Sequence, residues 1–170
     1  IDSLKIEGRM KSEFYVASVV KAYREALDSY WEDPENFEFK QEWMDILLKV
    51  SHRPYHTGFF FGKSGEQNYE DSSYIRDYDI VGIVKEFDEE TMTATIMQKN
   101  RVFEGDSVDI LRPYTPNFSI KMNSMYDVEK DVETNVANRA HMIFKMKVDT
   151  PLKVNDMLIK GKQTLEFGDK

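Results

Sequence analysis

The sequence predicts an α+β protein in which the end of an α/β domain is followed by a small antiparallel β-barrel. Residues 3–6 alternate apolar and polar and lead through a turn into an amphipathic stretch at 13–30, the pattern of a terminal βα unit. Residues 63–77 are rich in glycine, serine and acids and predict a linker. After residue 78, about six short alternating segments follow, as in a small barrel or sandwich.

The composition is that of a folded chain that does not enter a membrane. Hydrophobic residues make up 41% of the 170 residues and aromatic residues 13%, which is enough for a core. No apolar run approaches the roughly eighteen residues of a membrane span. The net charge of −8 makes the chain a poor non-specific binder of nucleic acid, because phosphate affinity comes from cations. The chain has no cysteine, which excludes disulfides and thiolate metal sites within it and fits a cytoplasmic protein.

The strand–turn–helix unit at the start organises the prediction. Leu4 and Ile6 share one side of the short strand, Gly8 permits the turn, and Ser12 is placed to cap the helix. The helix has an apolar face at spacings of three and four, formed by Tyr15, Val16, Val19, Val20, Tyr23, Ala26, Leu27 and Tyr30. Because one parallel strand needs neighbours, and none follows, we expect this unit to be the C-terminal piece of a larger α/β domain.

The turn after the predicted strand carries three charges, Glu7, Arg9 and Lys11. Loops after the C-termini of strands bind ligands in α/β folds. These residues are therefore candidates for substrate binding, although the spacing alone is better explained by Glu7 and Arg9 pairing with each other or with a neighbour.

A second helix is predicted from Lys40 to about Val50. Its apolar face consists of Trp43, Ile46, Leu47 and Val50. Upstream of it, Asp33 and Pro34 have the character of a helix cap and first helical position.

Residues 51–62 are dense in aromatic and histidine side chains. His52 and His56 have a spacing found in metal sites, but Pro54 opposes the helix that would align them, and no third ligand is evident. We therefore predict no metal site. Phe59, Phe60 and Phe61 suit either packing or a surface that stacks on a ring.

The barrel prediction rests on short alternating segments. They lie at 78–84, 91–98, 108–111, 118–122, 140–146 and 157–159, with a tight turn at 103–106. Six cations in this region could form a basic strip, but acids are interspersed and a solvated surface is the better interpretation: Lys99, Arg101, Arg112, Lys121, Lys160 and Lys162.

Three stretches together resemble the collagenase-like peptidase family U32. Residues 3–12, with Tyr15-Val16 and Tyr23-Arg24, are similar to its late catalytic-domain motif. Residues 52–55 and 57–59 are similar to its second motif. Residues 82–84 and 100–106 are similar to its C-terminal barrel, which in turn resembles domain two of elongation factor Tu.

The resemblance implies an upstream (β/α)-barrel-like catalytic domain and an iron–sulfur cluster held by cysteines that this chain lacks. It also implies involvement either in peptide hydrolysis or in hydroxylation of the wobble uridine of transfer RNA, with prephenate as a required metabolite. The candidate substrate contacts are Glu7, Arg9, Lys11, His52, Arg53 and Tyr55. No general base, nucleophile or protease triad is evident, so the catalytic residues stay unassigned.

We therefore divide the chain into the end of a catalytic α/β domain (1–62), a linker (63–77) and a barrel (78–167). The leading hypothesis is transfer-RNA hydroxylation, with the barrel docking substrate or covering the cleft. The alternatives are a peptidase and a non-catalytic interaction barrel. Under each hypothesis we expect this chain alone to be inactive and its own upstream domain to be a partner.

Overall fold

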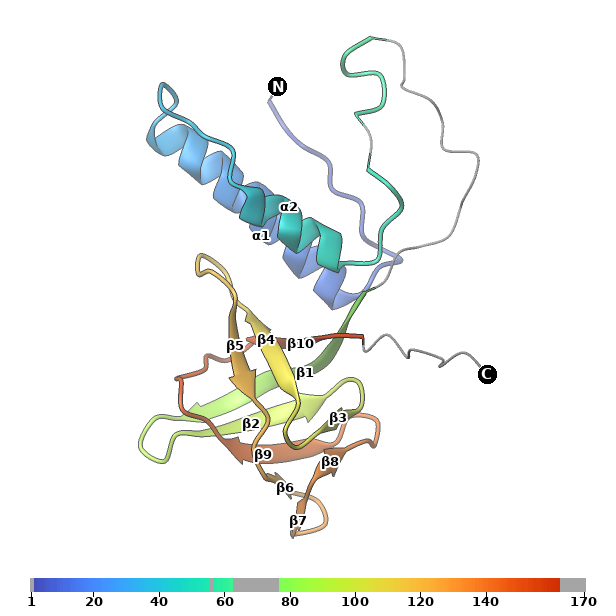
Figure 1. Cartoon of the computed structure of the whole chain (residues 1–170), viewed down its shortest axis with the longest axis vertical. Coiled ribbons are helices and arrows are strands. Elements are labelled where there is room, and N and C mark those ends of the chain that lie inside the picture. The colour runs from blue at the N-terminus through green and yellow to red at the C-terminus, as the bar shows by residue number, and fades with distance from the viewer. Residues whose placement is uncertain (1, 56, 63–76, 163–170) are drawn as a thin grey trace, which may run out of the picture. The chain divides into compact units, whose positions relative to one another are not determined.

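The computed structural model describes residues 2–55, 57–62 and 77–162. The chain divides into two compact units, Ile1–Asp77 and Tyr78–Lys170, which are treated separately below (Figure 1). Two helices in the first unit and antiparallel strands in the second make this an α+β protein, as predicted. The predicted linker lies almost wholly outside the described residues.

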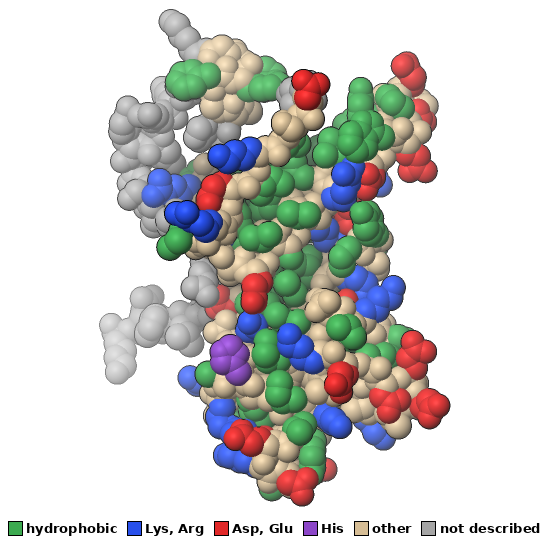
Figure 2. Space-filling view, turned by 180° about the vertical axis from the view of Figure 1, so that it is seen from behind, with side chains coloured by type: hydrophobic (Ala, Val, Ile, Leu, Met, Phe, Trp, Pro, Cys, Tyr) green, Lys and Arg blue, Asp and Glu red, His purple; other side chains and the backbone are tan. Residues whose placement is uncertain are grey.

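The first unit is built on two packed helices, α1 (Glu13–Glu32) and α2 (Gln41–Lys49). Helix α1 begins where the sequence predicts, because the Ser12 Oγ accepts a hydrogen bond from the backbone N–H of Tyr15 at 3.2 Å. Trp43, Ile46 and Val50 of the second helical segment are buried. Figure 2 shows hydrophobic side chains gathered along the helices of this unit.

An aromatic cluster joins the connection between the helices to α2. Phe37 stacks on Trp43 with ring centroids 6.0 Å apart, while Tyr30 and Phe39 make edge contacts at 5.6 Å with Phe37 and Trp43 respectively. Such contacts add to the burial of apolar area and fix the return of the chain between the two helices.

Two local predictions for this unit are wrong. Residues 2–6 do not form a strand, since a strand requires a hydrogen-bonded neighbour and none of the described residues supplies one. Asp33 does not start a helix. It ends α1, its N–H donating to the Ser29 carbonyl at 3.4 Å, and its carboxylate accepts from Asn36 in the turn that follows.

The second unit is an antiparallel sheet with a small companion sheet. Its main strands, in chain order, are β1 (Tyr78–Asp88), β2 (Thr93–Gln98), β4 (Ser107–Leu111), β5 (Phe118–Lys121), β6 (Met125–Asp127), β7 (Val132–Thr134), β9 (Ile143–Lys147) and β10 (Met157–Gly161). They lie in the order β5-β4-β10-β1-β2-β9-β6-β7. The companion sheet pairs β3 (Val102–Phe103) with β8 (Val136–Ala137).

β10, the last strand of the described residues, lies inside the main sheet. β10 pairs with β1 on one side, from Tyr78 opposite Gly161, and with β4 on the other, from Leu111 opposite Met157. Figure 1 shows β10 between these two strands. The centre of the sheet is therefore made by residues about eighty positions apart in the sequence.

The core lies on one face of these strands, as the alternation predicts. Ala94, Ile96 and Gln98 of β2 are buried, while Thr93, Thr95 and Met97 between them are half-buried. Phe144 and Met146 of β9 are buried in the same way. The predicted turn at 103–106 is also present, with Gly105 at a φ of +86° that favours glycine.

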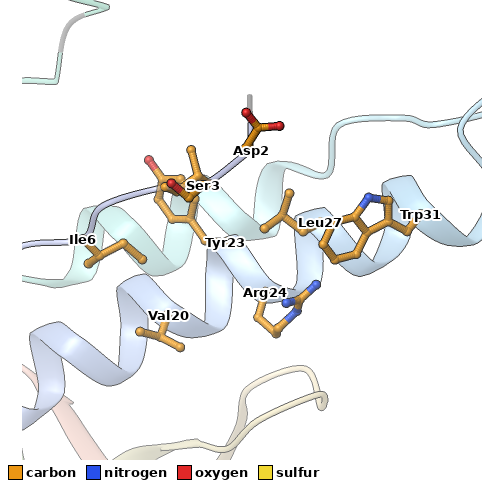
Figure 3. A pocket seen from close by; sticks show the side chains of 9 residues that line it. Asp2, Ser3, Ile6, Val20, Tyr23, Arg24, Leu27 and Trp31 are labelled. Atoms are coloured by element: carbon orange, nitrogen blue, oxygen red, sulfur yellow. The ribbon is translucent and has the colours of Figure 1, made fainter.

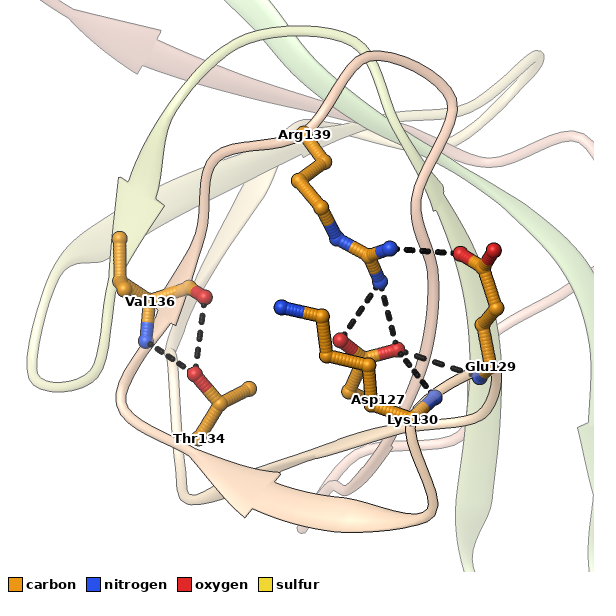
Figure 4. A network of polar contacts seen from close by, with 6 residues as sticks. All are labelled: Asp127, Glu129, Lys130, Thr134, Val136 and Arg139. Atoms are coloured by element: carbon orange, nitrogen blue, oxygen red, sulfur yellow. Dashed lines mark hydrogen bonds and ion pairs between the residues drawn. The ribbon is translucent and has the colours of Figure 1, made fainter.

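Ion pairs tie the connections of the sheet together. Arg112 binds the buried carboxylate of Asp156, and Lys160 binds Asp106 at 2.6 Å, so two of the six cations considered for a basic strip are paired with acids. In the β6–β8 region, Arg139 binds both Asp127 and Glu129 at 2.6 Å (Figure 4). No helix in the described parts of the chain has the length and apolar character needed to cross a membrane.

Candidate functional site

The charged turn before α1 is held by its own backbone. The Lys11 N–H donates to the Gly8 carbonyl at 2.9 Å, and the Glu7 Oε1 accepts from the backbone N–H of Arg9 at 3.0 Å. The Glu7 carboxylate therefore binds the main chain of Arg9. The Arg9 side chain is left exposed at the tip of the turn.

The turn lies against the first turns of α1. A Cβ placed on Gly8 would be 2.9 Å from the Val16 Cγ2 and 3.7 Å from the Tyr15 ring, so only glycine allows this close approach. The Lys11 Nζ lies 5.2 Å from the centroid of the same Tyr15 ring, within the range of a cation–π contact.

The second motif follows α2 and is locked onto its end. The Nδ1 of the buried His52 lies 2.7 Å from the Val50 carbonyl, which favours the tautomer with a proton on Nδ1. The His52 ring stacks on Tyr55, with centroids 4.7 Å apart and planes 3° apart. The Tyr55 hydroxyl donates to the Leu47 carbonyl at 3.0 Å, although the residue as a whole is 49% exposed.

The two motifs meet at Tyr55. Burial of its hydroxyl raises the pKa of Tyr55, and electrostatic interaction with Tyr15 and Tyr23 of α1 raises that pKa further. Tyr15 in turn lies under Lys11. Lys11, Tyr15, Tyr23, His52 and Tyr55 are thus linked by ring contacts and electrostatic interaction. Arg9 and Arg53, which lie beside these residues in the sequence, are exposed. We call these seven residues the cation–aromatic surface.

This surface suits recognition of a planar or anionic group. Tyrosine rings offer faces on which a base or ring can stack, and arginine offers a planar fork that matches a carboxylate or phosphate. It contains no nucleophile paired with a general base. Within the described ranges, no three His, Cys, Asp or Glu residues are placed to hold a metal ion together. His56 lies outside those ranges.

Five of the predicted site residues fall into this arrangement as side chains: Arg9, Lys11, His52, Arg53 and Tyr55. Glu7 contributes through the backbone of the turn. The sequence analysis placed Tyr15 and Tyr23 on the apolar face of α1 and in the family motif, but not among the candidate substrate contacts. The sequence feature that could have indicated their role is tyrosine itself, because leucine or valine at these positions would pack in a core equally well.

The iron–sulfur cluster implied by the family resemblance finds no ligands here. Such clusters are held mainly by cysteine thiolates, and this chain contains no cysteine. The residues of this chain therefore do not fit an iron–sulfur cluster.

Comparison with curated proteins identifies relatives over nearly the whole chain. It is 41% identical over 164 residues, 95% of its length, to tRNA hydroxylation protein P1 of Bacillus subtilis. It is 30% identical over 162 residues to tRNA hydroxylation protein P of Haemophilus influenzae, and 35% identical over 138 residues to an uncharacterized protease of Methanocaldococcus jannaschii. The chain spans 39%, 34% and 33% of the lengths of these relatives, and thus about a third of each.

A solved structure also matches. It is the C-terminal domain of a Geobacillus thermoleovorans protein named as a U32 peptidase. The two sequences are 29% identical, the match covers 50% of this chain and 93% of that chain, and the TM-score is 0.45.

Two family models match consecutive parts of the chain. The model of peptidase family U32 matches residues 1–70, and the model of the peptidase family U32 C-terminal domain matches residues 76–158. Between them they account for both units of the structure, in agreement with the resemblance of the two motifs. The chain therefore belongs to peptidase family U32 and carries the C-terminal domain of that family.

Proposed function

We propose that this chain takes part in the hydroxylation of transfer RNA as a segment of a U32 protein. The observation that carries the proposal is its 41% identity, over 95% of its length, to a relative named tRNA hydroxylation protein P1. A surface able to bind anionic and planar groups supports it. In this proposal the hydroxylated nucleotide is the wobble uridine, and the protein acts in the cytoplasm.

In this proposal the cation–aromatic surface contacts the substrate or a small carboxylate metabolite such as prephenate. Arg9 neutralises a phosphate or carboxylate, Lys11 and Arg53 add positive charge, and the Tyr55–His52 stack presents an aromatic face. The rest of the catalytic domain supplies the reacting groups. The sheet unit closes as a small barrel that docks RNA or covers the cleft.

The test is nucleoside mass spectrometry of transfer RNA from a strain of the source organism without the gene and without any second copy of it. We expect hydroxyuridine and its derivatives to disappear and to return when the wild-type gene is restored. An Arg9→Ala version should restore about tenfold to a hundredfold less, since it loses a charge-assisted contact.

The matched control is Lys40→Ala, which removes an exposed cation of the first unit outside the cation–aromatic surface and should restore full hydroxylation. An unchanged nucleoside profile in the deletion strain would overturn the proposed function. Full restoration by Arg9→Ala would leave the function standing and remove Arg9 from the site.

A second candidate is peptide hydrolysis, favoured by the 35% identity to a protein named as a protease. It requires a water-activating group, which would have to come from the part of the relatives that this chain does not span. Two results together would select this candidate. The purified full-length protein would cleave denatured collagen, and deletion of the gene would leave the transfer-RNA nucleosides unchanged.

A further inference from the structure

The groove beside α1 is a poor place for an anionic ligand. It has a volume of about 410 Å³ and lies between the N-terminal segment and the helix (Figure 3). Apolar side chains such as Ile6, Val20 and Leu27 dominate its lining, and among the described residues that line it Arg24 is the one cation. Arg24 is already paired with Asp28 at 2.5 Å. The sheet unit carries a surface of a different character.

The register of the strands gathers five polar side chains on the outer face of β6, β9 and β2, which lie side by side in Figure 1. Lys145 of β9 lies opposite Tyr126 of β6 and opposite Thr95 of β2. Lys147, two residues further along β9, lies opposite Thr93. The apolar residues that alternate with them along the three strands belong to the core, so these five point outward. We call them the lysine–tyrosine face: Thr93, Thr95, Tyr126, Lys145 and Lys147.

The two lysines of this face are available to bind an anion. Both are exposed, and neither forms an ion pair with another residue in the part of the chain that the structure describes. The acid that interacts electrostatically with Lys145 is Asp88, whose carboxylate accepts the backbone N–H groups of Glu90 and Thr91 at 2.9 and 3.2 Å. That carboxylate is therefore engaged by its own turn.

The position of these lysines is not explained by the needs of the sheet. Their cross-strand neighbours are threonine and tyrosine, whereas lysines that stabilise a sheet lie opposite acids. β9 also lies between β2 and β6, so its lysines do not protect an open edge. Acids lie only at the two borders of the face, where Glu86 of β1 is opposite Thr95 and Glu133 of β7 is opposite Tyr126.

Tyr126 supplies an anchored ring beside these cations. Its hydroxyl donates to the Asp131 carboxylate, and the residue is 38% exposed. The same hydrogen bond raises the pKa of Tyr126, so the phenol stays neutral and does not repel a phosphate. A ring that is held at its hydroxyl end and exposed beside lysines is a platform on which a base can stack.

We propose that the lysine–tyrosine face binds a single-stranded stretch of transfer RNA, with Lys145 and Lys147 on phosphates and a base on the Tyr126 ring. A sheet that combines cations with a stacking ring is a recurrent way of holding single-stranded RNA. The threonine hydroxyls offer hydrogen bonds to phosphate or ribose oxygens. The inference rests on the proposed function for its choice of partner, and it assigns the docking of RNA to one face of the sheet unit.

The test measures binding of unmodified transfer RNA to the purified full-length protein by fluorescence anisotropy at several salt concentrations. Lys145→Gln combined with Lys147→Gln removes both cations of the face. Lys121→Gln combined with Lys153→Gln is the matched control, because it removes two exposed lysines from other parts of the same unit. Tyr126→Leu removes the ring, whereas Tyr126→Phe keeps the ring and loses only the bond to Asp131.

We expect the variant at 145 and 147 to bind about tenfold more weakly. The slope of log affinity against log salt should become shallower by about one to two, because two phosphate contacts no longer release counterions. The control at 121 and 153 should bind within about twofold of the wild type with the same slope. Tyr126→Leu should weaken binding about fivefold or more at an unchanged slope, and Tyr126→Phe should bind as the wild type does.

Equal losses in the two double variants, an unchanged salt slope in the first, or a wild-type protein without affinity for transfer RNA would overturn the proposal. Equal losses in Tyr126→Leu and Tyr126→Phe would overturn the stacking on Tyr126. If deletion of the gene abolishes hydroxyuridine while the variant at 145 and 147 binds normally, the docking face is refuted and the proposed function stands. If transfer RNA binds as expected while the nucleoside profile of the deletion strain is unchanged, the proposed function is refuted and the docking face stands.

Discussion

The negative charge of the buried Asp156 carboxylate is compensated by the Arg112 guanidinium. The side chain is 2% exposed and accepts bonds from the Arg112 Nε at 2.8 Å, the Arg112 Nη2 at 2.5 Å and the Lys153 N–H at 2.7 Å. We predict that Arg112→Met lowers the free energy of unfolding by about 3–5 kcal/mol, because it leaves a buried charge without its partner. Urea denaturation followed by circular dichroism measures this loss.

Arg101→Met is the matched control for that experiment, since Arg101 is an exposed arginine of the same unit. Its effect should stay within about 0.5 kcal/mol. Equal effects of the two substitutions would show that the ion pair of Arg112 contributes nothing measurable.

Asp127 makes part of the stability depend on pH. Burial of the carboxylate opposes ionisation and acts to raise its pKa, but the Lys130 N–H, the Arg139 guanidinium and the Glu129 N–H stabilise the charged form (Figure 4). The net effect is a pKa of Asp127 below its ordinary value. Its stabilising contribution is therefore present above the ordinary carboxylate pKa and is lost as the pH falls through the lowered pKa.

We predict that Asp127→Asn melts at a lower temperature than the wild type at pH 7, and that the difference narrows as the pH falls below about 3.9. Melting curves from pH 7 down to pH 2.5 (roughly the acid end of the carboxylate range) measure the difference. Glu133→Gln, an exposed acid on the neighbouring strand, should show no such pattern. A constant difference at all pH values would contradict the assignment.

At the scale of elements, the contact between β1 and β2 depends on a missing side chain. A Cβ on Gly82 would be 2.7 Å from the Ile96 Cγ2 and 3.4 Å from the Met97 carbonyl oxygen. We predict that Gly82→Ala costs about 1–3 kcal/mol through overpacking. The change should be visible in urea denaturation.

Gly161→Ala on β10 provides the comparison, since its nearest neighbours would be Tyr78 ring atoms at 3.6 Å, an ordinary contact. It should change the free energy of unfolding by less than about 1 kcal/mol. If Gly82→Ala and Gly161→Ala change the free energy of unfolding equally little, β1 and β2 can move apart enough to accept the added methyl group.

The length of each strand decided whether it could be predicted from the sequence. β2 and β9 have five or six residues, enough to show two full periods of alternation, and the predicted segments at 91–98 and 140–146 overlap them. β3, β7 and β8 have two or three residues, too few for a period, and the sequence analysis missed them. Their formation depends on neighbours far along the chain, such as Val102 opposite Ala137.

The candidate site was predicted in parts but not as a whole. The residue types of the turn at 7–11 and of the segment at 52–55 indicated ligand binding separately. Their meeting at Tyr55 depends on how α2 packs on α1, which no local pattern encodes. The burial of the apolar face of α1 was also hard to predict. Its valine and tyrosine residues have the spacing of a core-facing stripe, but Val20 and Tyr23 are exposed in this structure.

At the scale of the whole molecule, the net charge of −8 and the cation–aromatic surface are compatible. An acidic chain repels nucleic acid in general, so binding must be confined to places where cations and rings gather. If the proposed function holds, this combination favours recognition of a particular structured RNA over non-specific coating of any nucleic acid.

The central position of β10 also sets the order in which the sheet can be completed during synthesis. At about 5–20 residues per second, several seconds pass between the emergence of β1 and that of Met157–Gly161. Throughout that interval β1 and β4 each have an open edge that β10 will later occupy. The sheet unit of a nascent chain is therefore most prone to aggregation before β10 is made, and truncation before Met157 leaves both edges open permanently.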